Sequence, residues 1–242
     1  MSHPFDLSNR RIAISGAGGG IGSATARLVA DMGAEVMLSD LEAPTALADQ
    51  IRAQGRSAEA TALDVTDRGA VEAWAQACDA VDAFIDCAAI CPFDNWEDDG
   101  WDGVAERVFA TNLQGPLNLT RAFLRGMIER KNGRMALISS IAGRSGGVRA
   151  APHYVMAKGG IIGFVRWLAR KGAPHNVLVN AVAPSPVATP MIEGVPFDTD
   201  TFPLRRVAQP EEIAGPLAFL ISPAASYISG VVIDINGAMY FG

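Results

Sequence analysis

The stretch HYVMAKGG places Tyr154 and Lys158 four residues apart, a spacing that puts both side chains on one face of the helix expected here. A free tyrosine titrates at about pH 10, and a nearby ammonium group favours the phenolate and lowers that pKa. Ser140 ends the apolar stretch RMALISS, 14 residues before Tyr154, where its hydroxyl can donate to a substrate oxygen. Together these residue types suit proton transfer to and from an oxygen atom.

A second chemical feature is the stretch SGAGGGIG at residues 15–22, directly after the apolar run RIAIS. It matches neither the G-x-G-x-x-G template nor the Walker pattern, because no glycine stands at the required third position and no lysine follows. Glycines in a turn between a strand and a helix let the backbone approach a pyrophosphate, and the helix N-terminus supplies N–H groups. The stretch therefore predicts a dinucleotide-binding turn.

Asp40 follows the next apolar run, EVMLS, 18 residues beyond Gly22. A carboxylate at this place can accept hydrogen bonds from both ribose hydroxyls of an adenosine and would repel a 2′-phosphate. The neighbouring residues Ala17, Ser39 and Leu41 add no positive charge. This favours NAD over NADP as cofactor, although a helix-capping or solvated carboxylate is the alternative.

Short apolar runs alternate with longer helical patterns along the whole chain. We expect strands at 11–15, 35–39, 57–62, 82–86, 134–139, 176–182 and 231–235, and helices at 21–32, 44–54, 68–78, 103–131, 153–171 and 210–221. This alternation predicts a single α/β domain spanning 1–242, a Rossmann-type doubly wound parallel sheet of about seven strands with helices on both faces. Five prolines between Pro184 and Pro203 exclude a regular helix, so we expect a substrate lid at 186–204, or else a rigid surface loop.

The composition and net charge of the chain limit the classes of partner that we expect it to bind. A net charge of −6 argues against a nucleic-acid or anionic membrane surface, and no apolar stretch is long enough for a membrane span. The three cysteines show no disulfide framework, and we expect a cytoplasmic protein. Cys87 and Cys91 have no matching histidine or further cysteine nearby, so no metal site is expected.

In its ordered motifs the chain resembles the short-chain dehydrogenase/reductase family. SGAGGGIG is similar to that family's [TS]-G-x-x-x-G-x-G turn. The resemblance continues through Asp64-Val65, Asn112 in TNLQG, Ser140 with Tyr154 and Lys158, VNAVAPS, and RVAQPEEIAGPLAFLISPAASYISG. It covers nearly the full length of the chain.

The resemblance implies a role for each of these residues. Tyr154 would be the general acid and base, Ser140 would orient the substrate oxygen, and Lys158 would bind the nicotinamide ribose and lower the pKa of Tyr154. Asn112 would hold a water in a proton relay, and Pro116, which lacks an N–H, predicts a helix kink beside it. Cofactor contacts are implied for Gly16, Gly19, Gly20, Ile21, Gly22, Asp40, Leu41, Asp64, Val65, Cys87, Ala88, Ala89, Tyr154, Lys158, Pro184, Val187 and Thr189.

The chain departs from the family pattern at three places. Asp86-Cys87-Ala88-Ala89 replaces Asn-Asn-Ala-Gly, Pro184-Ser185 replaces Pro-Gly, and Gly237-Ala238 replaces Gly-Gly. None of these changes removes one of the expected catalytic groups.

Pocket residues are expected from adjacency to the reactive groups. The candidates are Ile90, Cys91, Phe93, Ile141, Arg144, His153, Met191, Phe197 and Tyr240. Arg144 and Arg149 are candidates for a substrate carboxylate, or else for solvent or a subunit contact. The resemblance implies a homotetramer, with a dimer as the second choice.

The first functional hypothesis is an NAD(H)-dependent oxidoreductase that interconverts a secondary alcohol and a ketone by hydride transfer. A reductase of 3-ketoacyl thioesters is the alternative within catalysis. A non-catalytic NAD-binding sensor or scaffold is the alternative of another class, and relatives of that kind would be expected to lose Tyr, Lys or Ser.

Overall fold

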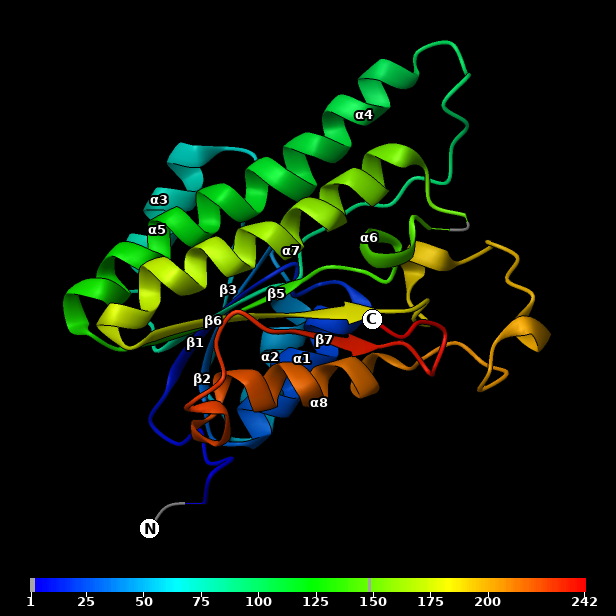
Figure 1. The fold of residues 1–242 in the computed structure, drawn as a ribbon. Coiled ribbons are helices and arrows are strands. Elements are labelled where there is room, and N and C mark those ends of the chain that lie inside the picture. The colour runs from blue at the N-terminus through cyan, green and yellow to red at the C-terminus, as the bar shows by residue number, and fades with distance from the viewer. Residues whose placement is uncertain (1–2, 148) are drawn as a thin grey trace.

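The computed structural model describes residues 3–147 and 149–242, and its centre is one sheet of seven parallel strands (Figure 1). The strand order is β3-β2-β1-β4-β5-β6-β7. The strands are β1 (Arg11–Ser15), β2 (Glu35–Asp40), β3 (Ala58–Ala62), β4 (Ala83–Asp86), β5 (Gly133–Ile138), β6 (Val177–Pro184) and β7 (Val232–Ile235). The predicted fold class is confirmed, and each expected strand is present within two residues of its predicted ends.

Helices cover both faces of this sheet (Figure 1). They are α1 (Gly20–Asp31), α2 (Thr45–Ala53), α3 (Arg68–Ala77), α4 (Trp101–Phe109), α5 (Gly115–Arg130), α6 (Ala142–Ser145), α7 (Pro152–Gly172) and α8 (Pro210–Ile221). One core cluster lies between the sheet and α1, α2 and α8, and another lies between the sheet and α3, α5 and α7. The central strands are therefore buried on both faces, which explains their continuous apolar sequences.

The helix expected at 103–131 is divided by a short π-helical segment, η1 (Ala110–Gln114). At its end the Gly115 N–H donates to the Ala110 carbonyl, five residues earlier. Pro116 cannot donate the α-helical bond to the Asn112 carbonyl, and the wider turn lies beside this missing donor. The interruption expected from Pro116 is thus present, but as a π turn between two helices.

The chain order reverses between β1 and β4, which are neighbours at the centre of the sheet. At such a switch point the loops after the two strands separate and leave a crevice at the carboxyl edge of the sheet. The loops after β1, β4, β5 and β6 all begin at this edge, because the strands are parallel. Residues far apart in the sequence therefore meet there.

The stretch 186–204 contains two single turns of 3-10 helix, η3 (Pro190–Ile192) and η4 (Thr199–Thr201). It extends from the end of β6 beyond the sheet edge before α8 begins (Figure 1). Two further 3-10 turns are η2 (Ala173–His175) and η5 (Pro223–Ala225). Within the described ranges, the helices are all too short or too polar to cross a lipid bilayer.

Candidate active site

A cavity of about 620 Å³ opens at the carboxyl edge of the sheet. Its wall includes Ser140, Tyr154 and Lys158 together with residues from the stretch 186–204. The three residues that sequence analysis selected for chemistry therefore lie around one space.

The glycine-rich turn after β1 has the geometry that its sequence predicts. Gly16 has a φ of +66°, and a Cβ there would lie 2.5 Å from the Ala88 nitrogen, so the turn packs directly on the loop after β4. A Cβ at Gly22 would lie 2.1 Å from the Gly16 carbonyl oxygen. Side chains are thus excluded at both positions, and the turn and the start of α1 form one tight unit.

Helix α1 begins at Gly20 without a side-chain cap, because its N-cap residue is Gly19. The first N–H groups of a helix need acceptors, and the helix dipole makes this end attractive to an anion. A capless, side-chain-free helix start fits the pyrophosphate of a dinucleotide.

Asp40 lies at the end of β2, beside this turn. Its Oδ2 accepts from the Gly18 N–H at 2.9 Å, and its Oδ1 accepts from the Leu41 N–H at 2.8 Å. These bonds hold the carboxylate at the edge of the predicted adenosine-ribose site. Farther along the same edge, Asp64 Oδ1 accepts from the Thr66 N–H and hydroxyl, and Val65 packs on Gly115.

Lys158 is buried within α7, and its Nζ donates to the Ile138 carbonyl oxygen at 2.8 Å. The same Nζ lies 5.7 Å from the centre of the Tyr154 ring. A second bond, from the Ser139 hydroxyl to the Lys158 carbonyl, joins α7 to the end of β5. The side chains of Ser140, Tyr154 and Lys158 are therefore positioned by one strand end and one helix.

Burial shifts the pKa values of both Tyr154 and Lys158. Desolvation raises the pKa of Tyr154, and its interaction with the Ser140 hydroxyl acts in the opposite direction. The lowered pKa predicted from the sequence depends on an oxidised nicotinamide as well as on Lys158, and in the protein alone the pKa of Tyr154 instead shifts upward. The phenol loses solvation when the protein folds, and this loss outweighs the favourable contacts. Desolvation likewise lowers the pKa of Lys158, while the charge of Asp86 raises it.

Asp86, which replaces the family's Asn, is buried at the end of β4. Its Oδ1 accepts from the Ser15 hydroxyl at 2.7 Å and from the Ala88 N–H at 3.1 Å. Desolvation raises the pKa of this carboxyl, and the Lys158 charge partly offsets the effect. The departure thus places a second ionisable group beneath the cavity, next to Lys158.

Asn112 is fully buried in the π turn. Its Oδ1 accepts from the Ile90 N–H at 2.9 Å, and its Nδ2 donates to the Ile90 carbonyl at 2.8 Å. The side chain therefore holds the loop after β4 in place. This structural use was not apparent from the sequence, because Asn112 and Ile90 lie on different elements.

The predicted cofactor residues include several that line the cavity, namely Ile21, Cys87, Ala89, Pro184, Val187 and Thr189. A Cβ at Gly20 would lie 2.5 Å from the Thr189 methyl, so the chain after β6 packs over the glycine turn. Desolvation raises the pKa of Cys91 to about 11 and also raises the pKa of Cys87, so both remain thiols at neutral pH.

The expected pocket residues divide into two groups. Cys91, Phe93, Ile141, Met191 and Phe197 line the cavity, and so does Arg149. Arg144, His153, Ile90 and Tyr240 are absent from its lining, and these expectations are corrected by the structure. Arg144 is instead paired with Asp234 at 3.0 Å, where it holds β7. At the C-terminus the wall is formed by Ala238, already noted as a departure from the family pattern, and by Met239, which the sequence did not single out, in place of Tyr240.

His153 lies inside the protein, although it directly precedes Tyr154. Its Nε2 is 3.0 Å from Asp94 Oδ1, and its ring stacks on Trp101 with the centroids 5.2 Å apart. No sequence signal connects Asp94 with His153. The pair joins the loop after β4 to the start of α7.

Another departure has a visible conformational consequence. Ala238 has a φ of +68°, in the left-handed region that favours glycine. The usual Gly-Gly of the family has this freedom at both positions, and the alanine here is held in the strained conformation at the cavity wall.

Comparison with known proteins extends these observations. The sequence pattern of the family described as "Enoyl-(Acyl carrier protein) reductase" matches residues 16–239. The chain is 32% identical to the 3-oxoacyl-[acyl-carrier-protein] reductase FabG of Vibrio harveyi, covering 98% of this chain and 99% of that protein. It is 36% identical to the acetoacetyl-CoA reductase of a Synechocystis species, covering 96% and 97%.

Solved structures agree with this relationship. A 3-oxoacyl-[acyl-carrier protein] reductase with bound NAD from Brucella melitensis is 31% identical and superposes with a TM-score of 0.91 over 98% of this chain and 94% of that one. A protein described as a putative NAD(P)-dependent gluconate 5-dehydrogenase from Beutenbergia cavernae, with bound NADP at low occupancy, is 33% identical with a TM-score of 0.91, covering 97% and 98%. This chain therefore belongs to the short-chain dehydrogenase/reductase family, and it is a pyridine-nucleotide-dependent oxidoreductase that acts on CH–OH groups.

Proposed function

We propose that the protein is an NAD(H)-dependent oxidoreductase that interconverts a secondary alcohol and a ketone. The observation that carries this proposal is the meeting of Ser140, Tyr154 and Lys158 around one cavity at the carboxyl edge of the sheet. All three residues of the family's reactive set are present, which argues against a non-catalytic sensor.

In this proposal the bound dinucleotide supplies or accepts a hydride, and the chain's own residues manage the oxygen atom. The Tyr154 phenolate takes the proton from the alcohol during oxidation, and the Tyr154 hydroxyl gives that proton to the carbonyl oxygen during reduction. The Ser140 hydroxyl donates to the same oxygen and holds it toward Tyr154.

Lys158 contributes its positive charge and binds the nicotinamide ribose. Its ammonium group lies near enough to the Tyr154 ring to favour the phenolate. Asn112, on the π turn, holds a water that links Lys158 to solvent.

The remaining cofactor contacts follow the loops at the sheet edge. The proposed contacts with the pyrophosphate, adenosine and nicotinamide come from Gly16, Gly19, Gly20, Ile21, Gly22, Asp40, Leu41, Asp64, Val65, Cys87, Ala88, Ala89, Pro184, Val187 and Thr189.

The preference for NAD rests on Asp40. Two backbone N–H groups hold its carboxylate at the end of β2, and the adjoining residues Ala17, Leu41 and Glu42 bring no positive charge. A 2′-phosphate at this place would meet an unneutralised carboxylate. The related structures include both an NAD and an NADP complex, so the cofactor is decided by this chain's own residues.

The test is a pair of fluorescence titrations with NADH and NADPH, on the wild type and on Asp40→Asn. Wild-type protein should bind NADH at least tenfold more tightly than NADPH. The substitution keeps the side-chain shape and removes the charge, so it should weaken NADH and strengthen NADPH, each by about tenfold, or about 1.4 kcal/mol.

Asp49→Asn serves as the matched control, because Asp49 is an exposed carboxylate on the nearby α2. It should leave both affinities at the wild-type values. Tighter binding of NADPH by the wild type would contradict the assignment of Asp40 and would make reduction the physiological direction.

A 3-ketoacyl thioester reductase is the second candidate, and the similarity to FabG and to acetoacetyl-CoA reductase favours it. Reduction of acetoacetyl-CoA, measured beside oxidation of simple secondary alcohols, separates the two. A kcat/KM for the thioester that exceeds every other value would place the protein in this second class.

We further propose that segment 186–204 is the substrate lid and that the protein is a cytoplasmic homotetramer. The lid is supported by the residues of this segment that line the cavity. The cytoplasmic compartment is supported by the three free cysteine thiols. Exposed apolar side chains on η1, α5 and α7 support the assembly, namely Leu113, Leu117, Met156 and Trp167. Light scattering on the purified protein measures the oligomer.

A further inference from the structure

Two arginines follow Ser140, and they have different environments. Arg144 donates from Nε to Asp234 Oδ1 at 3.0 Å and from Nη2 to the Val232 carbonyl at 3.0 Å, so its charge is used inside the fold. Arg149 instead lines the cavity. Within residues 3–147 and 149–242, no carboxylate lies within ion-pair distance of Arg149.

Aromatic side chains hold Arg149 at this position. Its guanidinium carbon lies 6.0 Å from the centre of the Phe197 ring, which belongs to segment 186–204. Phe197 meets Phe93 edge-on, with the centroids 6.4 Å apart, and Phe202 at 6.3 Å. Stacking of this kind uses the charge of the guanidinium and none of its N–H donors, which stay available for a ligand.

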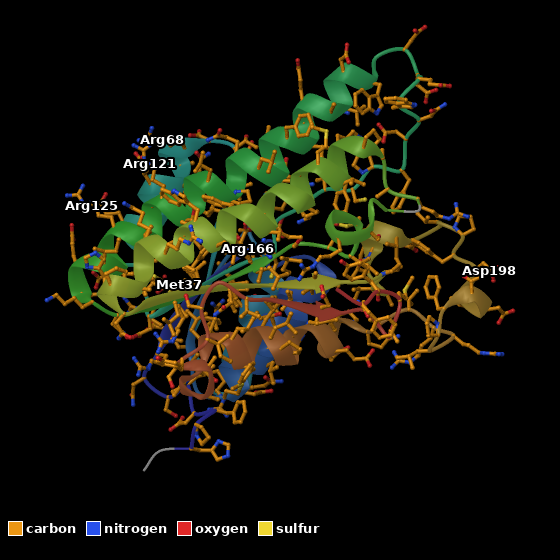
Figure 2. All side chains as sticks on the ribbon, viewed as in Figure 1. Met37, Arg68, Arg121, Arg125, Arg166 and Asp198 are labelled. Atoms are coloured by element: carbon orange, nitrogen blue, oxygen red, sulfur yellow. The ribbon has the colours of Figure 1, made fainter. Side chains whose placement is uncertain are left out.

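Two other charged residues line the cavity. Lys158 donates to the Ile138 carbonyl and lies beside Tyr154, at the reacting end. Asp198 caps the turn η4 by accepting from the Asp200 N–H at 3.2 Å, and it lies at the outer end of segment 186–204 (Figure 2). Among the described residues that line the cavity, Arg149 is therefore the cation that has no ion-pair partner in the protein and lies away from the reacting end.

We propose that Arg149 binds a carboxylate of the substrate, so that the substrate is a hydroxy acid and its product the corresponding keto acid. This inference rests on the proposed function. A guanidinium matches a carboxylate with two parallel hydrogen bonds, and such a charge-assisted pair is stronger than a hydrogen bond between neutral groups. The apolar lining from Phe93, Met191 and Phe202 suits the carbon chain between the carboxylate and the carbinol.

The test compares short 3-hydroxy acids with their methyl esters, as substrates with NAD, in the wild type, Arg149→Gln and Arg149→Lys. The wild type should prefer the acid over its ester by about 10–100-fold in kcat/KM, as expected for a charge-assisted pair. Arg149→Gln should abolish that preference, mainly through a higher KM for the acid. Arg149→Lys should keep part of it, because the charge remains and the two-pronged geometry is lost.

Arg170→Gln is the matched control, since Arg170 is an exposed cation in the last turn of α7 and does not line the cavity. It should retain the wild-type preference. Equal use of acid and ester by the wild type, or an unchanged preference in Arg149→Gln, would overturn the proposal.

The phosphates of a coenzyme A thioester offer the same kind of charge, so 3-hydroxybutyryl-CoA forms a third arm. A preference for this thioester over the free acid that disappears in Arg149→Gln would overturn the assignment to a carboxylate. Absence of turnover with every substrate, despite NADH binding, would contradict the proposed function instead. Calorimetric binding of acid and ester to the NADH complex would then still decide the role of Arg149.

Discussion

The pKa values of Lys158 and Tyr154 are each shifted in opposite directions by different features of their surroundings. In the proposed mechanism the ammonium group near the phenol ring favours the phenolate, whereas burial disfavours both charged forms. Sequence analysis could predict the pair from its spacing. It could not predict the direction of the Tyr154 pKa in the protein alone, because desolvation depends on everything packed around the ring.

This balance predicts the pH dependence of the reaction. Oxidation needs the Tyr154 phenolate, and a raised pKa means that kcat/KM for oxidation increases with pH into the alkaline range. Reduction needs the neutral phenol and should persist at neutral pH. Replacing Lys158 by Met removes the cation that favours the phenolate, so the rise in the oxidation profile should move to still higher pH.

The profiles are measured at saturating NAD, with Tyr154→Phe as the baseline that lacks the group. That variant should lose about 10²–10⁴ in kcat while still binding NADH. Identical profiles for Lys158→Met and the wild type would refute an electrostatic role for Lys158.

Among the elements, the junction of α4, η1 and α5 connects the helical layer with the loop after β4. Pro116 in the sequence predicts an interruption, and the structure places a π turn there. Asn112 uses this turn to hydrogen-bond both the N–H and the carbonyl of Ile90. A one-dimensional pattern indicates the interruption but not its partner, since the two residues are 22 positions apart.

Asn112→Ala should therefore lower the free energy of unfolding by about 2–4 kcal/mol, because it leaves two partly buried backbone groups of Ile90 without partners and removes a buried side chain. Urea denaturation measures this loss. Gln114→Ala, at an exposed position on the same π turn whose Nε2 donates a single bond to Asn118 Oδ1, should lower stability by no more than about 1 kcal/mol. Equal stability of the two variants would mean that solvent readily replaces the Asn112 bonds.

At the scale of the whole molecule, the sheet with its two core clusters is separate from the aromatic contacts that close the cavity. The cores lie between the sheet and its helices, whereas Phe197 of segment 186–204 contacts Phe93 and Phe202 outside them. Apart from Val187, which belongs to one core cluster, the segment that bounds the substrate space thus lies outside both cores.

Phe197→Ala tests this separation. It removes ring contacts of about 0.5–1.5 kcal/mol each and the aromatic support of Arg149, so KM for the alcohol should rise several-fold while the melting temperature changes little. Phe5→Ala is the control, since Phe5 pairs with Phe219 away from the cavity. A large drop in melting temperature for Phe197→Ala would show that the segment belongs to the cooperative core.

The sequence by itself determined the parallel sheet, the glycine turn, the position of Asp40 and the Tyr154–Lys158 spacing. Each of these depends on patterns within one or two neighbouring elements, where periodicity and turn chemistry act over short distances. The tertiary structure alone decided that Arg149 and not Arg144 faces the cavity, and that His153 pairs with Asp94. Arg144 and its partner Asp234 are separated by 90 positions in the sequence, and His153 and Asp94 are separated by 59. Only the packing of the whole chain brings such partners within bonding distance.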